Sequence, residues 1–202
     1  MNITKVQTIR KIVLFVALVL GGFVFAVTDT VYPSGHWAHE LIEWAGIVLI
    51  MICVMGRTWS SLYIAGRKGE KLVTDGPYSV CRNPLYAFSI VGAAGMGAQT
   101  GSIVVGLICG IIAWIVFFVV VTQEEKLLLT VHGKAYRDYL RRVPRFFPKW
   151  WLWKDVQTLT ILPSRIVRTF GDALLFLLAV PIAEGFEYLQ ESGVIPVLMT
   201  LL

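Results

Sequence analysis

Uncharged apolar segments alternate with basic, polar segments along this chain. The first two apolar segments, residues 12–27 and 37–55, approach the roughly 20 residues that a helix needs to cross a bilayer. The turn-forming sequence Tyr32-Pro33-Ser34-Gly35 separates them. The basic start also suits a cleaved signal peptide, but no clear small-residue cleavage site precedes Asp29. We therefore expect two membrane-spanning helices in this part of the chain.

A longer stretch, from Asn83 to Gln123, has no charged side chain at all. It is longer than one span requires, and the polar break Gln99-Thr100-Gly101-Ser102 divides it. We expect a tight hairpin of two spans, at 84–98 and 103–122. Glycines in the first of these would let neighbouring helices approach closely. They are Gly92, Gly95 and Gly97.

The segment from 123 to 168 is basic and aromatic. A short amphipathic helix is predicted after Gly133, ending before Pro144. The aromatic residues that follow suit the headgroup region of a bilayer. They are Phe146, Phe147, Trp150, Trp151 and Trp153. The next apolar segment, 169–183, is short and contains Asp172 and Pro181, so a fifth span, a re-entrant segment and a surface helix all stay open.

Composition supports a membrane protein, and the charges indicate its orientation. Of the 202 residues, 56% are hydrophobic and 15% charged, whereas about 25% are charged in a typical soluble domain. All 18 Lys and Arg residues lie within 1–11, 57–82 and 126–168. Because cytoplasmic loops collect Lys and Arg, we place these blocks and the N-terminus on the cytoplasmic side. The net charge of +5 is then a topology signal, and no nucleic-acid partner is expected.

Residue types that bind metals gather near the start of the second span. By their spacing, His36, His39, Glu40 and Glu43 share one helical face, as the ligands of one ion would. Such spacing arises often by chance, and the charge pattern puts this group on the side opposite the other polar residues. We interpret it as a solvated helix end and expect no metal.

A second polar group follows the cytoplasmic segments in order. Leu72-Val73-Thr74-Asp75-Gly76-Pro77-Tyr78 and Arg82-Asn83-Pro84-Leu85-Tyr86 precede the third span. Glu124-Glu125 follows the fourth, and Arg142-Val143-Pro144-Arg145 follows the amphipathic helix. Two adjacent carboxylates in a half-buried site need a cation, either arginine or a ligand with an ammonium or sulfonium group. A Glu-Arg cluster that only fixes topology is the structural alternative.

This ordered group resembles the isoprenylcysteine carboxyl methyltransferase family of membrane enzymes, whose relatives include the phospholipid N-methyltransferases. The resemblance covers about residues 57–148. Its matching residues are Leu72, Val73, Gly76, Pro77, Tyr78, Arg82, Pro84, Tyr86, Glu124, Glu125, Leu128, Gly133, Tyr136, Tyr139, Arg142, Val143, Pro144 and Pro148. Asn83 stands where the family has histidine, and Val120 lies near the position of an arginine in eukaryotic members.

The resemblance implies S-adenosylmethionine as the cofactor, bound without a Rossmann domain, and no Gly-x-Gly-x-x-Gly motif follows a strand here. Carried over by position, the cofactor-binding residues are Lys71, Leu72, Val73, Tyr78, Asn83, Pro84, Leu85, Tyr86, Glu124 and Glu125. Arg142 and Arg145 would contact the substrate. No catalytic base is assigned, because methyl transfer from a sulfonium depends mainly on positioning and exclusion of water.

The predicted fold class is all-α, a polytopic integral membrane protein with four or five transmembrane helices and a cytoplasmic cofactor pocket. Residues 1–148 would form the methyltransferase domain, with a motif-bearing core at 57–148, and 149–202 an aromatic interfacial segment and a C-terminal hydrophobic helix. The implied reaction methylates a lipophilic or membrane-delivered acceptor that is similar to an isoprenylcysteine carboxylate or a phospholipid. The expected partners are this acceptor and the membrane lipids around the protein. Two alternatives stay open: an NADPH-dependent membrane reductase of the sterol reductase type, and a non-enzymatic membrane protein on the same scaffold. The acceptor atom and the oligomeric state are not predictable from these residues.

Overall fold

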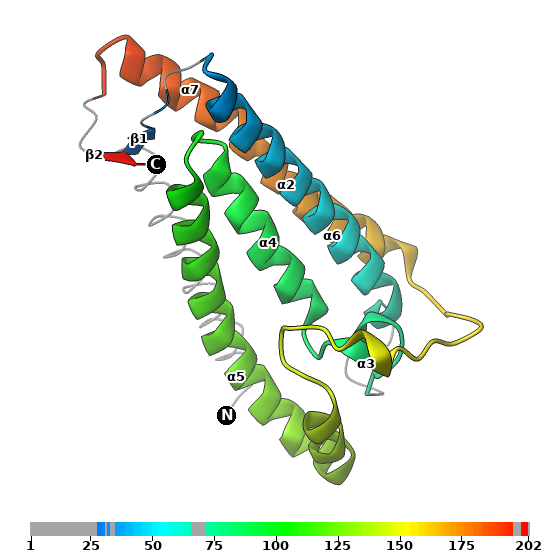
Figure 1. Cartoon of the computed structure of the whole chain (residues 1–202). Coiled ribbons are helices and arrows are strands. Elements are labelled where there is room, and N and C mark those ends of the chain that lie inside the picture. Colours follow the sequence, from blue (N-terminus) through cyan, green and yellow to red (C-terminus); the bar gives the residue numbers. More distant parts are fainter. Residues whose placement is uncertain (1–27, 31, 33–34, 66–71, 196–198, 202) are drawn as a thin grey trace.

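The computed structural model describes residues 28–195 and 199–201, except for 31, 33–34 and 66–71. The first predicted span, 12–27, and the predicted cofactor residue Lys71 therefore lie outside the described residues. Within them the chain has the predicted fold class, an all-α membrane protein whose long helices run side by side (Figure 1).

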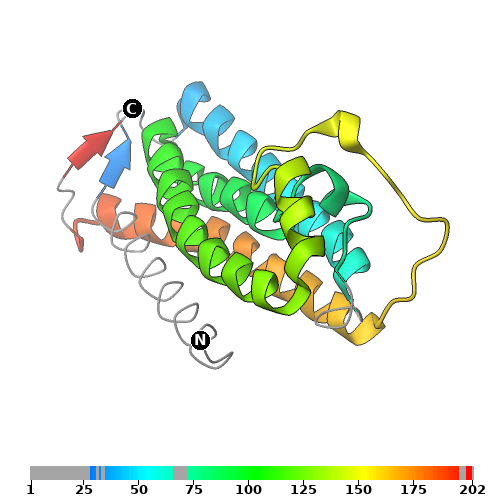
Figure 2. The ribbon, with the colours of Figure 1, turned by 90° about the horizontal axis from the view of Figure 1, so that it is seen from below.

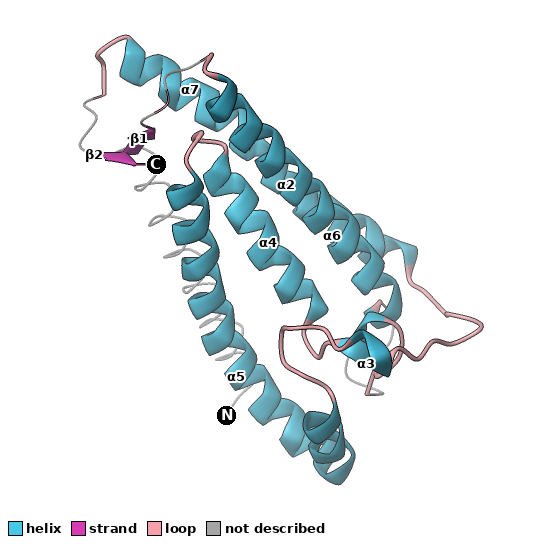
Figure 3. Cartoon of the chain, viewed as in Figure 1, coloured by secondary structure: helices cyan, strands magenta, loops and turns pink. Residues whose placement is uncertain are grey.

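Six α-helices make up most of the described chain (Figure 3). They are α2 (Trp37–Ile64), α3 (Pro77–Val80), α4 (Pro84–Ala98), α5 (Ile103–Arg142), α6 (Pro163–Leu174) and α7 (Ala179–Glu191). Two short 3-10 helices, η1 (Trp150–Leu152) and η2 (Leu175–Leu178), complete them, and η2 joins α6 to α7. The sequence did not predict the two short strands β1 (Thr28–Thr30) and β2 (Met199–Leu201), which pair in parallel with Thr28 opposite Met199.

Three described helical runs are long and apolar enough to cross a membrane: α2, α5 and the run Pro163–Gln190. The predicted hairpin of α4 and α5 is present, and its turn lies at 99–102. Helix α4 is apolar but has only 15 residues. The run Pro163–Gln190 packs along α2, so the segment that the sequence left open is helical and of spanning length (Figure 1).

Close approach of α2 and α4 depends on glycine, as the sequence predicted for Gly95. A Cβ added there would lie 2.7 Å from the carbonyl oxygen of Gly46, which is shorter than any normal contact. The backbones of the two helices therefore meet directly, a packing that small residues allow in a bilayer. Nearby, Ile50 and Val54 of α2 pack against Ala173 and Ala179, which joins the C-terminal helices to the same bundle.

Helix α5 extends beyond its apolar part and breaks at Gly133, whose φ of 53° and ψ of −119° are not helical. The predicted amphipathic helix follows the break and ends at Arg142. Beyond the break, Tyr136 and Tyr139 pack with Val143 in a buried cluster. Seen from below in Figure 2, the chain then leaves the bundle in a long loop before it returns as α6.

Candidate functional site

The described segments that carry the predicted site residues come together at the end of the bundle that carries α3 (Figure 1). Backbone hydrogen bonds hold the segments of this end to one another. The Arg82 amide donates to the Pro144 carbonyl at 2.9 Å, and the Lys149 amide donates to the Val80 carbonyl at 3.0 Å. The Tyr139 hydroxyl donates to the Tyr78 carbonyl at 2.6 Å. Helix α3 and the loop after it are thus fixed against the last turns of α5 and the chain that follows α5.

Glu125 is the centre of a buried ion cluster. Its carboxylate lies 3.2 Å from Arg82 Nε and 2.5 Å from Arg145 Nη2. The Glu125 and Arg82 side chains are 8% and 11% exposed. Arg82 also donates to the Leu140 carbonyl at 2.8 Å. The cation that the paired glutamates require is therefore supplied, for Glu125, by arginines of the chain itself.

Glu124 has different surroundings from its neighbour. It is half-buried and accepts a hydrogen bond of 2.9 Å from the Tyr86 hydroxyl. The Tyr86 ring packs on Phe117, with the ring centroids 4.9 Å apart. A carboxylate beside an aromatic ring is suited to the hydroxyls or the positive charge of a ligand.

Four buried side-chain atoms near these residues have no hydrogen-bond partner in the described structure. Arg82 Nε and Glu125 Oε1 face each other in the ion cluster, which leaves the Tyr78 hydroxyl and Arg57 Nε. Burial raises the pKa of Tyr78 above its usual range, Tyr86 and Glu124 raise it further, and Arg57 lowers it. These four side chains therefore share one electrostatic neighbourhood. Because an unsatisfied buried polar atom costs about 1–3 kcal/mol, the Tyr78 hydroxyl and Arg57 Nε suit a polar ligand that would pair with them.

Arg57 was not among the residues predicted for the site. Its Nη1 donates to the Ser89 hydroxyl of α4, and its guanidinium lies over the Phe176 ring, 5.9 Å from the centroid. The sequence held one signal for it. A charged residue within an apolar helix faces the bundle interior and is commonly functional.

The remaining predicted residues vary in their closeness to this group. Asn83 Nδ2 donates to the Arg145 carbonyl at 3.3 Å, and Leu72 packs on the Tyr136 and Tyr139 cluster. Pro84 begins α4 and is buried, whereas Val73 and Leu85 are half-buried. Arg142 is exposed, unlike Arg145, which lies in the ion cluster.

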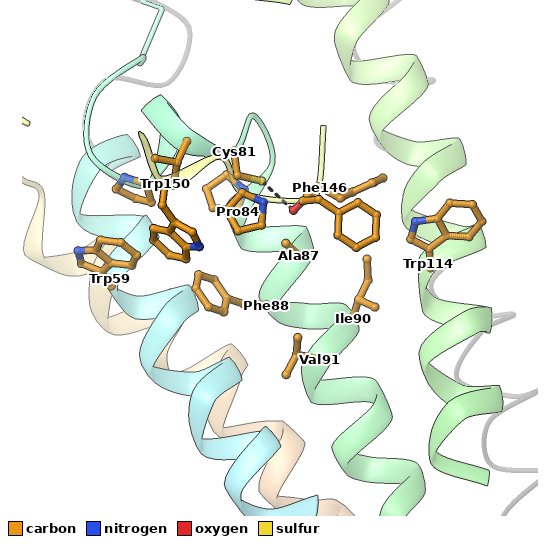
Figure 4. Close-up of a pocket in the computed structure, with 14 residues that line it drawn as sticks. Trp59, Cys81, Pro84, Ala87, Phe88, Ile90, Val91, Trp114, Phe146 and Trp150 are labelled. Atoms are coloured by element: carbon orange, nitrogen blue, oxygen red, sulfur yellow. Dashed lines mark hydrogen bonds between the residues drawn. The ribbon is translucent and has the colours of Figure 1, made fainter. Parts of the chain in front are cut away.

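An apolar cavity of about 300 Å³ adjoins the beginning of α4 (Figure 4). Its lining comes from four regions of the chain and includes Trp59, Pro84, Phe88, Trp114, Phe146 and Trp150. Cys81 also lines it, and its thiol donates to the Phe146 carbonyl at 3.3 Å. Burial raises the pKa of Cys81 to about 11, so this thiol stays protonated at neutral pH and is a poor nucleophile.

The polar group and the apolar cavity share the first turns of α4. Pro84 and Ala87 line the cavity, while Tyr86, between them in sequence, reaches Glu124. A polar, positively charged ligand and an apolar one can therefore be held next to each other. Such an arrangement is suited to transfer of a group between the two, with water excluded by the aromatic lining.

Comparison with known proteins bears on this chemistry. The model of the family named phospholipid methyltransferase matches residues 13–135. The chain is 34% identical over 168 residues to the cobalt-zinc-cadmium resistance protein CzcN of Cupriavidus metallidurans, a match that covers 83% of this chain and 77% of that protein. It is 33% identical to the nickel-cobalt-cadmium resistance protein NccN of Alcaligenes xylosoxydans, over 82% and 77% of the two chains.

A shorter match, 32% identical over 94 residues, is to the protein-S-isoprenylcysteine O-methyltransferase of Schizosaccharomyces pombe, and it covers 46% of this chain and 40% of that enzyme. No solved structure matches the chain. The family match includes more than half of the residues and contains Tyr78, Tyr86 and Glu124. The resemblance seen in the sequence is thus confirmed, and the chain belongs to the phospholipid methyltransferase family.

Proposed function

We propose that this chain is an S-adenosylmethionine-dependent methyltransferase that acts on a lipophilic or membrane-delivered acceptor. One observation carries the proposal: two buried atoms without a hydrogen-bond partner, the Tyr78 hydroxyl and Arg57 Nε, lie near the bonded pair of Tyr86 and Glu124 and beside an apolar cavity. The cofactor would supply a methyl group on a sulfonium centre, and the cavity would hold the apolar part of the acceptor.

The chain's own residues divide the work of binding the cofactor. Glu124 would accept from its hydroxyl or amino groups, and the aromatic face of Tyr86 would lie near its positive charge. Arg57 would pair with its carboxylate, which would satisfy the buried Nε atom. Glu125 is already paired with Arg82 and Arg145, so we assign it to holding α4 and α5 in register and not to contact with the cofactor.

The acceptor side is supported by the aromatic segment that follows α5. Phe147 and Trp151 are 80% and 79% exposed, and Trp150 reaches the cavity. Exposed aromatic side chains of this kind lie at the headgroup level of membranes. We infer that an acceptor enters sideways from the bilayer. The basic blocks near this end support placing it on the cytoplasmic side.

Ligand binding by the purified protein tests the proposal. S-adenosylmethionine and NADPH are titrated separately by calorimetry into the full chain in lipid nanodiscs. Saturable binding of S-adenosylmethionine alone supports the methyltransferase. Binding of NADPH supports the reductase alternative, and binding of neither supports a non-enzymatic scaffold. Methyl-labelled S-adenosylmethionine with a membrane lipid extract then identifies the acceptor, as the species that gains the label.

The names of two relatives suggest a physiological setting. Both are named for resistance to cobalt and cadmium, with zinc in one case and nickel in the other. We propose that methylation by this chain contributes to tolerance of such ions. A deletion strain should grow less well in cobalt, the intact gene should restore growth, and the Glu124→Gln gene should not. Equal growth of all strains would contradict this setting.

A further inference from the structure

A histidine and a carboxylate of α2 meet a carboxylate of α7 at the end of the bundle opposite α3 (Figure 1). His39 Nε2 lies 3.3 Å from Glu43 Oε1 in α2 and 3.7 Å from Glu187 Oε1 in α7. His39 is 5% exposed, so it is not the solvated helix end that its sequence context suggested. We propose that His39, Glu43 and Glu187 bind a divalent transition-metal ion such as Zn²⁺.

The hydrogen bonding of His39 leaves its Nε2 atom as a metal ligand. Its Nδ1 atom lies 3.1 Å from the Tyr32 carbonyl oxygen, and a carbonyl oxygen can only accept. Nδ1 therefore carries the proton, and in the neutral ring Nε2 presents its lone pair toward the two carboxylates. Metal-ligating histidines almost always donate their other N–H to a carbonyl or carboxylate in this way.

Three electron-rich atoms facing one another need a cation between them, and the described residues at this end of the bundle include no lysine or arginine to provide it. None lies in 12–56, 83–125 or 169–202, the segments that supply the start of α2, the turn after α4 and the end of α7. A bound ion, or a proton on one of the three groups, would therefore balance Glu43 and Glu187. The distances favour the ion as an occupant.

The spacing of the three ligand atoms suits one small ion. With bonds of about 2.0–2.2 Å, neighbouring ligands of a tetrahedral Zn²⁺ lie about 3.3–3.6 Å apart. The two distances from His39 Nε2 are 3.3 and 3.7 Å, and all three atoms lie within 4.8 Å of one another. Glu43 and Glu187 are 30% and 31% exposed, which leaves them room to close on the ion.

The site is built on rigid elements and leaves one position open. A Cβ on Gly101 would lie 2.3 Å from His39 Nδ1, so the turn after α4 packs directly on the ring and holds it in place. The other two residues of the predicted group are excluded. His36 caps α2 by accepting from the Ala38 amide, and Glu40 is exposed. One nitrogen and two oxygen ligands favour Zn²⁺ or Co²⁺, with the fourth position left for water.

Metal titration of untagged, chelator-treated protein in nanodiscs tests this site. Zn²⁺ is titrated by calorimetry, and Co²⁺ by the visible absorption that reports its coordination. We expect one ion per chain, with affinity at least about tenfold weaker in Glu187→Gln and in Glu43→Gln. Glu40→Gln removes the same charge from an exposed position of α2 and should bind as the wild type does.

Glu187→Gln alone keeps the test decisive if the less exposed Glu43→Gln fails to fold, and circular dichroism checks both variants. No saturable binding by the folded wild type would overturn the proposal, because a proton shared by the three groups would then take the place of the ion. Equal binding by Glu187→Gln, or equal loss in Glu40→Gln, would overturn it as well. The readout does not involve methyl transfer, so it is independent of the proposed enzyme activity.

Discussion

Glu124 and Glu125 are adjacent in sequence, yet they lie in different surroundings, and the same substitution should affect them in different ways. Glu125 faces Arg82 and Arg145 and is almost fully buried. Glu124 is half-buried and bonded to the Tyr86 hydroxyl. One is held by internal charges, and the other is in a position to contact a ligand.

Glu125→Gln should lower stability. It leaves two largely buried guanidinium groups without their carboxylate, and removing one partner of a buried ion pair costs about 3–5 kcal/mol. The measurement is the free energy of unfolding in mixed detergent micelles. Asp138→Asn, a charge removal at an exposed position of α5, is the control and should change stability by less than about 0.5 kcal/mol. If Glu125→Gln were as stable as the wild type, the ion cluster would not hold α4 to α5.

Glu124→Gln should leave stability nearly unchanged, because the amide oxygen still accepts from Tyr86. The affinity for S-adenosylmethionine should fall by about 1.5–3 kcal/mol, or roughly tenfold to a hundredfold, since a charged hydrogen-bond acceptor is lost. Calorimetry with the folded variant measures it. Unchanged affinity would contradict the role of Glu124 in the cofactor site.

At this scale the sequence predicted part of the site. The order of motifs around a hairpin was enough to bring Tyr86 to Glu124, because the two ends of a helical hairpin meet at one membrane surface. It did not separate the two glutamates, since their partners come from Arg82 and Arg145, which lie 43 positions before and 20 positions after Glu125. It missed Arg57 because a basic residue near a span is ordinarily a topology signal.

At the scale of elements, the break in α5 directs the amphipathic end back toward α3. A Cβ on Gly133 would meet nothing within 4 Å, so only its backbone conformation demands glycine. Gly133→Ala should therefore destabilise the protein by about 1–3 kcal/mol and weaken cofactor binding, because Tyr139 would lose its bond to Tyr78. Unfolding and calorimetry measure the two effects.

Gly171→Ala is the matched control, since it is the same change, also with open space around it, in ordinary helix α6. There alanine should stabilise by about 0.5–1 kcal/mol through its helix propensity. If the free energy of unfolding changed in the same direction in Gly133→Ala and Gly171→Ala, the break at Gly133 would not be needed for the native fold.

The helices that the sequence left undecided have a physical explanation. Pro181 lies in the first turn of α7, directly after η2, where a missing N–H costs little. Asp172 is exposed on α6. Neither residue interrupts the run Pro163–Gln190, although both argued from the sequence against a continuous span. The strands were not predicted because each has three residues and pairs only with a segment from the other end of the chain.

For the whole molecule, the cavity joins four distant regions of the chain, and no local pattern could have predicted it. The cavity also distinguishes two neighbouring tryptophans by their position. Trp150 lines the cavity and Trp151 does not, although both are exposed, at 61% and 79%. Trp150→Ser should lower methyl transfer to a lipid acceptor about tenfold with cofactor affinity intact, since an acceptor in the cavity would lose roughly 55 Å² of apolar contact with this ring, worth about 1.4 kcal/mol.

Trp151→Ser is the control for this change and should retain most of the activity. Transfer to extracted lipids and calorimetry are measured side by side on both variants. Equal activity of Trp150→Ser and the wild type would mean that the acceptor does not occupy the cavity.

The orientation of the whole molecule in the membrane can be tested by cysteine labelling with only one of the described native cysteines replaced. Cys53 and Cys81 are 0% and 3% exposed, and a pKa of about 11 leaves almost no reactive thiolate on Cys81 at neutral pH. Only Cys109 needs replacement, by alanine. A cysteine at exposed Ser192, at the end of α7, should then react with an impermeant maleimide from outside intact cells, and one at exposed Lys134 should react only after lysis. Labelling of the Lys134 position in intact cells would put the cofactor end of the bundle outside the cytoplasm. Because no soluble supply of S-adenosylmethionine is expected there, this result would count against the proposed reaction as well as the orientation.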